Sequence, residues 1–340
     1  MRFIALGAAI VGAVAAYSAW WLSVAHSVPA LIAQQAERAR AAGYEVETGT
    51  PTVEGYPYRM VARLPRLVLA APKAAGSPRY EGEQVTMVAQ PWNLNHLIIR
   101  ADGTERLSWQ PAGDAGRTSL KIDASRAFAS LVLRDGALER LALDLTEPRL
   151  RTDAMTTDLG LKRIQVHARR LLKEEGAEGA GLELALEAEA AALPPEWSGP
   201  LGPEMALARL ALKLSGPLPV ALDAAAAAAW RDAGGTLEVE QLAVKWGRMD
   251  ATGDGTLALD EQMRPLGAFG LHVSGWEQGI AAAVASGRIK QKAGDAARLA
   301  LGLLGLANHD AEGRVGVPFT LQNGRVLVGP VPVATLDPLF

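Results

Sequence analysis

An acidic, glycine-rich run is the part of this sequence whose spacing comes nearest to a binding site for an ion. Residues Asp250–Glu261 read DATGDGTLALDE and match an EF-hand calcium loop at positions one, five, six, eight and twelve. Position three is Thr252 and position nine is Ala258, and the flanking residues alternate as in strands, whereas an EF-hand requires flanking helices. We therefore expect a hairpin in which Asp and Gly supply turn geometry, and no metal site.

The residue types that carry most enzymatic chemistry are sparse or absent. The chain has no cysteine, which excludes disulfides, thiolate nucleophiles and cysteine-ligated metals. None of its five histidines is spaced i, i+4 from another, and the nucleophile motifs Gly-x-Ser-x-Gly and Ser-x-x-Lys do not occur. We expect no catalytic residue, no cofactor and no enzymatic activity. A glycosidase-type pair among the many carboxylates stays open, because spacing in sequence does not define such a pair.

Nucleic acid is not an expected partner. The chain carries 34 Lys and Arg against 37 Asp and Glu, a formal net charge of −3, and shows no clustered basic stretch. With 49% hydrophobic residues, the composition also excludes intrinsic disorder.

Aromatic residues mark two segments that are candidates for contact with a ligand. The first is the loop containing Tyr56, Pro57 and Tyr58, and the second contains Trp92 and His96. A turn in which Pro57 sets the backbone angle and the tyrosines cover a sheet edge is the favoured interpretation of the first. Packing of Trp92 and a hydrogen-bonded histidine are the favoured interpretation of the second.

One apolar segment is long enough to cross a membrane. Phe3–Val24 contains no charged residue, and about 20 apolar residues span a hydrocarbon core as a helix. Arg2 precedes the segment and the next Lys or Arg is Arg38, so the positive-inside rule places the N-terminus in the cytoplasm. We expect a single-pass inner-membrane anchor (residues 1–25) with the bulk of the chain in the periplasm.

A cleaved signal peptide is the alternative interpretation of this segment. Ala13-Val14-Ala15 has the small-x-small form of a cleavage site, but it lies inside the apolar run rather than after it. Trp20 and Trp21 at the far end suit a membrane–water interface better than a cleavage site. The uncleaved anchor is therefore favoured.

A short stalk helix is expected to follow the anchor over residues 26–43. Pro29 suits the first turn of a helix, and Gly43 is a natural stop at its end. The remaining residues, 44–340, are expected to form a β-rich domain.

A period of two dominates the residues after Gly43. In Leu182–Ala190 and again in Ala208–Ser215, apolar residues alternate with a second set that includes most of the charges, which is typical of antiparallel strands with one buried face. A phase slip at Glu240-Gln241 predicts a bulge. Asp102-Gly103 and Asn323-Gly324, each between apolar runs, predict hairpin turns.

Helices are expected at Asp223–Trp230, which contains six consecutive alanines, and at Trp276–Leu306, with a break near Gly287 or Gly294. The Gly- and Pro-rich residues 193–203 are either a domain boundary or a long loop. The predicted fold class is mainly β with a few helices (α+β), an elongated curved antiparallel sheet or sandwich with the C-terminal helices packed on it.

The order of several short motifs resembles one known family. The stalk and Gly43 are followed by Val53–Arg59 (VEGYPYR) and Gln90–His96 (QPWNLNH), and this order is similar to the proteobacterial envelope proteins of domain of unknown function 2125 (DUF2125). Leu321–Pro330 (LQNGRVLVGP) resembles the closing hairpin of that family and of larger AsmA-like proteins. The resemblance implies a periplasmic protein anchored in the inner membrane, with an elongated curved sheet and, by distant analogy, a lipid-lined groove. It implies no catalytic residues.

Two functions follow as hypotheses. An open apolar sheet face would bind lipid or acyl chains and serve lipid transfer or maintenance of the cell envelope. A filled core would leave a structural or scaffolding module that binds an envelope protein partner and no lipid. Alternation of apolar and polar residues predicts both equally.

Overall fold

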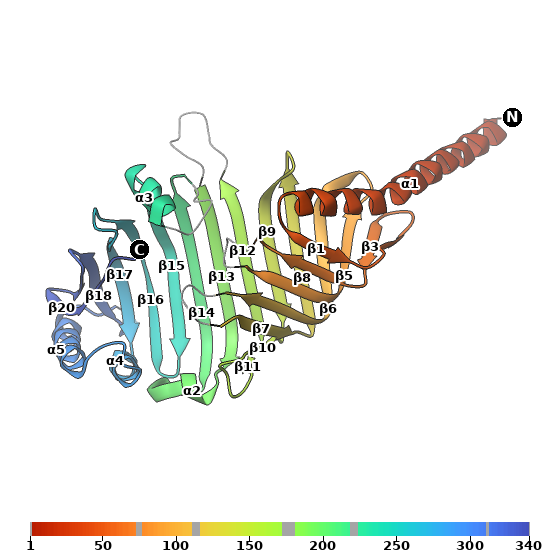
Figure 1. Ribbon diagram of the computed structural model, residues 1–340. Helices are drawn as coiled ribbons and strands as arrows, with labels where there is room; N and C mark the ends of the chain where they lie inside the picture. The colour runs from red at the N-terminus through yellow and green to blue at the C-terminus, as the bar shows by residue number, and fades with distance from the viewer. Residues whose placement is uncertain are drawn as a thin grey trace. The chain divides into compact units, whose positions relative to one another are not determined.

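The computed structural model describes residues 2–72, 77–110, 116–171, 181–217, 224–310 and 313–339 (Figure 1). Strands prevail, they pair antiparallel, and helices lie at both ends of the chain, which confirms the predicted fold class. The chain separates into two compact units: unit 1 comprises Met1–Leu138 and Leu150–Asp153, and unit 2 comprises Glu139–Arg149 and Ala154–Phe340. The Gly- and Pro-rich residues 193–203 lie inside unit 2.

Unit 1 begins with one long helix, α1 (Arg2–Ala41), in which Pro29 is an interior residue (Figure 1). The sequence predicted a stalk helix over residues 26–43; residues 26–41 are helical in the structure, but they continue the anchor helix without a break. An interior proline costs about 3 kcal/mol because it removes one hydrogen bond and crowds the preceding turn. Packing on both sides of Pro29 offsets that cost: Trp21 and Ala25 are buried before it, and Ala36 after it.

The end of α1 is fastened to the first strand. The guanidinium of Arg40 donates to the carbonyl of Val46 from both Nε (3.0 Å) and Nη2 (2.6 Å). Gly43, with φ of +89°, follows the last turn, and its N–H bonds the carbonyl of Arg40, as expected for a helix stop.

The strands of unit 1 are built around one long hairpin, β5–β6. Beside β5 lie β4 at its first half and β3 at its second half; beside β6 lie β8 at its first half and β7 at its second half. Beyond these, β1 pairs with β4 and β2 with β3. The bounds are β1 (Glu45–Thr48), β2 (Thr52–Glu54), β3 (Met60–Leu64), β4 (Leu67–Ala70), β5 (Arg79–Gln90), β6 (Asn93–Trp109), β7 (Thr118–Asp123), β8 (Arg126–Arg134) and β10 (Arg149–Thr152).

The change of partners along β5–β6 takes place at a bulge. Gly82 pairs with Glu105 and Gln84 with Asp102, so two residues of β6, Gly103 among them, face one residue of β5. The sequence predicted a hairpin turn at Asp102-Gly103, and this was wrong. Gly103 has a positive φ (+100°) but lies at a bend within β6. The strand continues through it because β6 has strand partners both before and after Gly103.

Unit 2 is an antiparallel meander in which each strand pairs with the next. The order of pairing is β9, β12, β13, β14, β15, β16, β17, β18, β19, β20. The bounds are β9 (Ala137–Thr146), β11 (Leu159–Gly160), β12 (Arg163–Leu171), β13 (Gly181–Ala192), β14 (Glu204–Ser215), β15 (Thr236–Trp246), β16 (Met249–Leu259), β17 (Pro265–Ser274), β18 (Val315–Gln322), β19 (Arg325–Val328) and β20 (Val331–Thr335).

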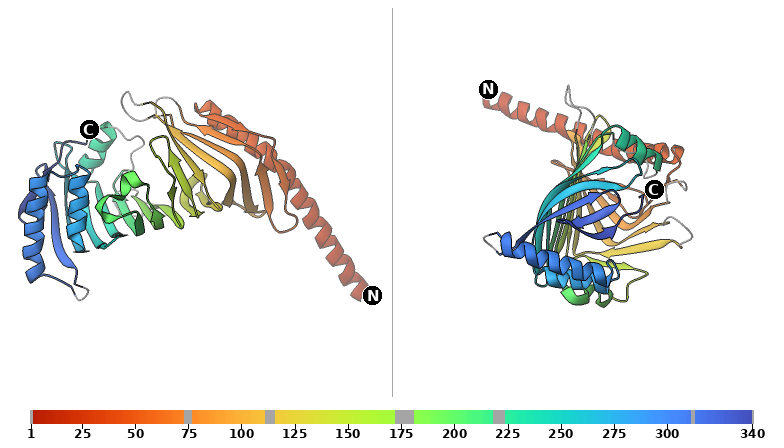
Figure 2. Two further views of the ribbon diagram at one scale, coloured as in Figure 1. Left: turned by 90° about the horizontal axis from the view of Figure 1, so that it is seen from below. Right: turned by 90° about the vertical axis from the view of Figure 1, so that its left-hand side faces the viewer.

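Among the described residues of unit 2, four α-helices accompany these strands: α2 (Pro195–Ser198), α3 (Ala224–Asp232), α4 (Trp276–Ala285) and α5 (Gln291–Ala307), and a 3-10 helix over Gly199–Leu201 follows α2. The expected break between the last two is confirmed, and Gly287 lies in it with φ of +70°. Residue 223, where the sequence predicted that α3 begins, lies outside the described residues. Helices α4 and α5 lie side by side at one end of the unit (Figure 2), where Ile280 and Leu301 pack with Val315, Val317 and Val328.

Two turn predictions in unit 2 are confirmed. The register of β15 shifts between Val239 and Leu242 against β16, which is the predicted bulge at Glu240-Gln241. Asn323 (φ +54°) and Gly324 (φ +67°) join β18 to β19, with Gln322 paired to Arg325. Two consecutive positive φ angles define the twisted two-residue turn for which Asn-Gly is the preferred sequence.

Candidate functional site

The tyrosine loop after β2 lies against α1. The ring of Tyr56 meets the ring of Trp21 edge-on with centroids 5.4 Å apart, and its hydroxyl lies 2.6 Å from the hydroxyl of Ser18. One turn earlier in the helix, the hydroxyl of Tyr17 donates to the carbonyl of Pro57 at 2.5 Å. Trp21 and Met60 are both buried in this contact. Tyr56 and Pro57 therefore join the apolar helix to the sheet, and Tyr58 is 77% exposed beside them.

Trp92 and His96 lie at and after the β5–β6 turn. Trp92 is 60% exposed, and His96 is an exposed residue whose Nε2 lies 3.1 Å from the hydroxyl of Ser130 on β8. The structure brings Trp92 and Tyr58 to the same edge of the sheet, because Met60 pairs antiparallel with Ala89, Tyr58 comes two residues before Met60, and Trp92 comes three residues after Ala89. It does not bring His96 into contact with either of them.

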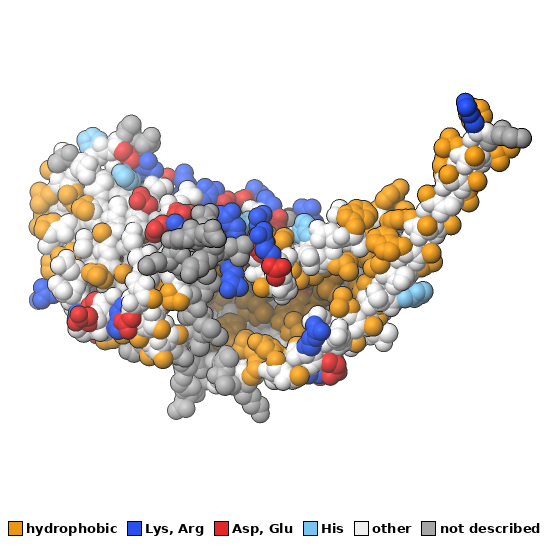
Figure 3. All heavy atoms as spheres, turned by 90° about the horizontal axis from the view of Figure 1, so that it is seen from above, with side chains coloured by type: hydrophobic (Ala, Val, Ile, Leu, Met, Phe, Trp, Pro, Cys, Tyr) orange, Lys and Arg blue, Asp and Glu red, His pale blue; other side chains and the backbone are white. Residues whose placement is uncertain are grey.

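Unit 1 contains an apolar hollow that the sequence did not predict. We call it the stalk-side hollow: a space of about 470 Å³ between the last turns of α1 and the strands β1, β4, β5 and β6. In Figure 3, apolar side chains gather in a depression beside the end of α1. One row of neighbouring residues across the four strands supplies its floor: Val46, Leu69, Tyr80 and Leu107.

Apolar groups dominate the walls of the hollow. Ala39 of α1 and Trp109 complete them, and the polar residues on its border are Tyr44, Arg79, Tyr80 and Ser108. The guanidinium of Arg79 forms ion pairs with Glu45 at 2.8 Å and Glu81 at 2.7 Å, so its charge is already paired within the protein. Leu69 and Leu107 are 41% and 37% exposed, so the floor is accessible. Ligand pockets commonly have volumes of about 300–1,000 Å³ with mostly apolar walls, and the hollow meets both criteria.

A buried acid lies next to the hollow on the same strand face. Glu105 is two residues before Leu107 on β6 and is 7% exposed. Its Oε2 accepts a hydrogen bond from the hydroxyl of Tyr80, whereas Oε1 has no partner among the described residues. Burial raises the pKa of Glu105, opposed by the Tyr80 hydrogen bond and reinforced by the negative charges of Glu83 and Asp102. Burial also raises the pKa of Tyr80.

The opposite face of these strands carries charges of both signs. Glu81, Arg106 and Lys121 form a row of neighbouring residues there and border a wide depression of about 600 Å³. Arg79 and Arg106 pair with Glu81, at 2.7 and 3.9 Å, and the pKa of Glu81 is lowered chiefly by its hydrogen bond to Arg79. The lining carries both signs, with Arg66, Arg106 and Lys121 beside Glu81 and Glu83, so this depression has no single sign that would select a charged ligand.

Unit 2 presents a second apolar surface, which we call the leucine face. Three rows cross β9, β12, β13, β14 and β15 on one side of the sheet, and among their residues only Leu145 is buried. The rows are Leu141-Ala168-Leu184-Leu212-Val239, Leu143-Val166-Leu186-Leu210-Leu242 and Leu145-Ile164-Ala188-Ala208-Val244.

Ion pairs occupy the other side of the same strands. Arg163 binds Asp144 at 2.6 Å, Arg209 binds Glu187 at 2.8 Å, and Lys213 lies 3.5 Å from Glu238. Along these strands the sheet is thus apolar on one side and charged on the other. The alternation was predicted from the sequence, and among the described residues of β12–β15 the apolar side is mostly half-buried rather than buried.

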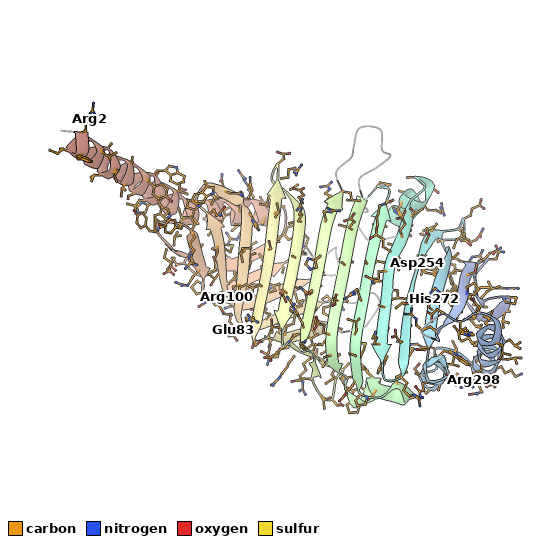
Figure 4. All side chains as sticks on the ribbon, turned by 180° about the vertical axis from the view of Figure 1, so that it is seen from behind. Arg2, Glu83, Arg100, Asp254, His272 and Arg298 are labelled. Carbon is orange, nitrogen blue, oxygen red and sulfur yellow. The ribbon has the colours of Figure 1, made fainter. Side chains whose placement is uncertain are left out.

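The run Asp250–Glu261 does not form a loop. Its first ten residues belong to β16, and Gly253 and Gly255 lie in the strand rather than in a turn. A Cβ on Gly255 would lie 2.3 Å from the ring of Phe269 on β17, so this glycine makes room for an aromatic neighbour. Figure 4 shows Asp254 on β16 and His272 on the adjacent strand β17.

The turn itself comes after β16. Asp260 caps it, since its Oδ1 accepts hydrogen bonds from the N–H groups of Gln262 and Arg264. The described residues contain no group of three or more His, Asp or Glu arranged to hold a metal ion.

These features define a mainly β protein with one N-terminal helix that is long and apolar enough to cross a membrane. Residues 21–337 match the family model described as an uncharacterized protein conserved in bacteria, DUF2125. The chain belongs to this family, as its motifs indicated. No curated protein and no solved structure matches it.

Proposed function

We propose that this protein is anchored in the inner membrane by α1, carries its strands in the periplasm, and binds the acyl chains of membrane lipids in the stalk-side hollow. The observation that carries the proposal is the hollow itself, an accessible space of about 470 Å³ with an apolar floor of Val46, Leu69 and Leu107. Exposed apolar surface of this kind costs about 25 cal/mol per Å² in water, so a ligand with an apolar body gains by filling it.

The position of the hollow favours an acyl chain over other apolar ligands. Its wall is made in part by Ala39, which belongs to the same helix as the uncharged segment Phe3–Val24. A ligand that leaves a bilayer crossed by that segment can reach the hollow along the same helix, about 25 Å beyond the membrane boundary. With Arg79 held by Glu45 and Glu81, recognition rests on burial of hydrocarbon and little on directed polar contacts.

A second candidate function is a scaffold that binds an envelope protein partner. The leucine face favours it, because a half-exposed apolar side of a sheet can be covered by a partner's sheet or helix. This surface belongs to unit 2 and the hollow to unit 1, so substitutions can separate the two functions.

The test is photocrosslinking of the full chain in detergent micelles with two probes, a diazirine-labelled palmitate and a phosphatidylethanolamine with a diazirine in one acyl chain. We expect crosslinks on peptides that contain Leu69, Tyr80 or Leu107. Leu107→Asn should reduce the yield several-fold, because it places an amide in the apolar floor.

Leu186→Asn is the matched control, since Leu186 is 38% exposed and Leu107 37% exposed. If Leu186→Asn removes the crosslinks and Leu107→Asn does not, the ligand lies on the leucine face. If neither probe crosslinks to either surface, lipid binding is rejected and the scaffold function remains.

A further inference from the structure

We infer that one edge of unit 1 lies within the interface of the bilayer that α1 crosses, and that Tyr58 and Trp92, together with Trp20 of α1, form its lipid-contacting surface. We call these three residues the aromatic edge. They are 77%, 60% and 41% exposed, which is unusual for side chains of this size. The inference requires α1 to span a membrane, but it does not require the stalk-side hollow to bind lipid.

The length of the uncharged segment places the interface. A helix rises 1.5 Å per residue, so the roughly 30 Å of hydrocarbon is crossed in about 20 residues. Counted from Arg2, the far boundary falls near Trp21 and Leu22. This is the turn of α1 that carries Trp20 and contacts the loop of Tyr56 and Pro57.

The contacts hold the loop at this depth. Tyr17 lies one turn closer to the membrane centre than Trp21, and its hydroxyl binds the carbonyl of Pro57. Ser18 lies 2.6 Å from the Tyr56 hydroxyl. The loop is thus fixed to the helix at, or just inside, the boundary of the hydrocarbon.

The sheet brings Trp92 to the same edge. Met60, which packs on Trp21 and Ala25, pairs with Ala89, and the β5–β6 turn carrying Trp92 follows directly. Tyrosine and tryptophan favour the membrane–water interface, because a flat apolar ring with one polar group suits the mixed environment of lipid headgroups. Arg59, exposed next to Tyr58, adds a cation at headgroup depth. The occupant of this surface is therefore lipid.

Because the chain contains no cysteine, single cysteines can report on this edge. One cysteine replaces Asn93, the first residue of β6 and the neighbour of Trp92 (Asn93→Cys). The control is Lys121→Cys on β7, because Lys121 pairs with Arg106 near the far end of β6. The full chain is labelled with bimane and reconstituted in vesicles of phosphatidylethanolamine and phosphatidylglycerol. We expect the label at residue 93, and not at residue 121, to be quenched by nitroxide lipids of shallow depth and protected from aqueous iodide.

The double variant Tyr58→Ser/Trp92→Ser should restore iodide quenching at residue 93, while flotation with the vesicles through α1 is retained. Equal iodide quenching of the two labels in vesicles would overturn the inference. So would protection of residue 93 in native membranes but not in pure lipid vesicles, since this would indicate a protein partner. A chain that no longer floats would instead reject the anchor on which both proposals rest.

Discussion

The hydroxyl of Tyr80 donates to one carboxylate oxygen of Glu105, and the other oxygen of this carboxylate is buried without a partner among the described residues. Both side chains share one face of the β5–β6 hairpin with Leu107, at the border of an apolar hollow. A charged acid in such a place is unfavourable, and the raised pKa of Glu105 expresses that cost.

We predict that stability falls as pH rises because of Glu105. Its folded-state pKa lies above its ordinary value of 4.5, so the folded protein binds the proton more tightly than the unfolded chain does. The stabilisation is complete below about pH 4.5 and is lost as the pH rises through the raised folded-state pKa. Thermal unfolding of Glu105→Gln in detergent should show a weaker decline in Tm over this window.

The control for this experiment is Glu47→Gln, which removes an exposed carboxylate of the same unit. If Glu105→Gln and wild type lose the same Tm between low and neutral pH, the acid is not responsible.

Gly82 is predicted to be required for the Tyr80–Glu105 pair. A Cβ at residue 82 would lie 2.5 Å from the Tyr80 hydroxyl and 2.6 Å from Oε2 of Glu105. Gly82→Ala should therefore lower the free energy of unfolding by about 1–3 kcal/mol, the usual cost of forcing extra volume into a packed site. Gly270→Ala in β17, where a Cβ would meet nothing within 4 Å, should be close to neutral. Comparable losses for the two variants, measured by denaturant unfolding, would contradict the prediction.

Trp21 is predicted to hold α1 to the sheet. Trp21→Ala removes a side chain that is 4% exposed and packs on Met60, which should cost about 3–5 kcal/mol. Its neighbour Trp20 is 41% exposed, so Trp20→Ala should change stability by less than about 1 kcal/mol. The rate of limited proteolysis between α1 and β1 measures how firmly the helix is held. Trp21→Ala should be cut faster than wild type, and Trp20→Ala should be cut at the wild-type rate. Equal protection of both variants would show that the helix is held elsewhere.

The mature protein is predicted to retain α1. Cleavage after Ala15 would leave a charged amino terminus on Ala16, directly before Tyr17, whose hydroxyl donates to the carbonyl of Pro57. Cleavage farther along would remove Trp21 from its contact with Met60. Intact mass spectrometry of the chain purified from membranes should give the full 35.8 kDa, apart from processing of the initial methionine. A mass corresponding to a start near residue 16 or 26 would establish a signal peptide.

The sequence predicted turns and bulges correctly where the residues of the turn or bulge themselves determine the backbone conformation. Asn323-Gly324 forms its turn because few other dipeptides tolerate two positive φ angles, and the bulge at Glu240-Gln241 follows from a change in the phase of apolar residues. Asp102-Gly103 failed for a tertiary reason. An Asp-Gly dipeptide is compatible with a bulge as well as with a turn. In this protein β6 pairs with β5 on one side and with β7 and β8 on the other, and these pairings keep β6 continuous through the dipeptide.

The stalk-side hollow lay beyond sequence reasoning, because its floor takes one residue from each of four strands and its wall from a helix. The one available signal was Glu105, an acid at a position that alternates with Leu107 and Trp109 on an apolar face. The sequence marked the aromatic loop and Trp92 as candidates, but it gave no sign that the loop contacts the helix through Tyr17, Ser18 and Trp21.

Because α1 continues without a break through Pro29, the strands of unit 1 are attached to the apolar segment by a rigid helix and not by a flexible linker. A flexible linker would let the helix change its tilt without moving the strands. Here the helix packs on the sheet at Trp21 and is hydrogen-bonded to it at Arg40, so helix and strands change orientation together. When a bilayer thins or thickens, a spanning helix answers by tilting. If α1 spans the inner membrane as proposed, unit 1 turns with it, and membrane thickness would then set the orientation of the stalk-side hollow.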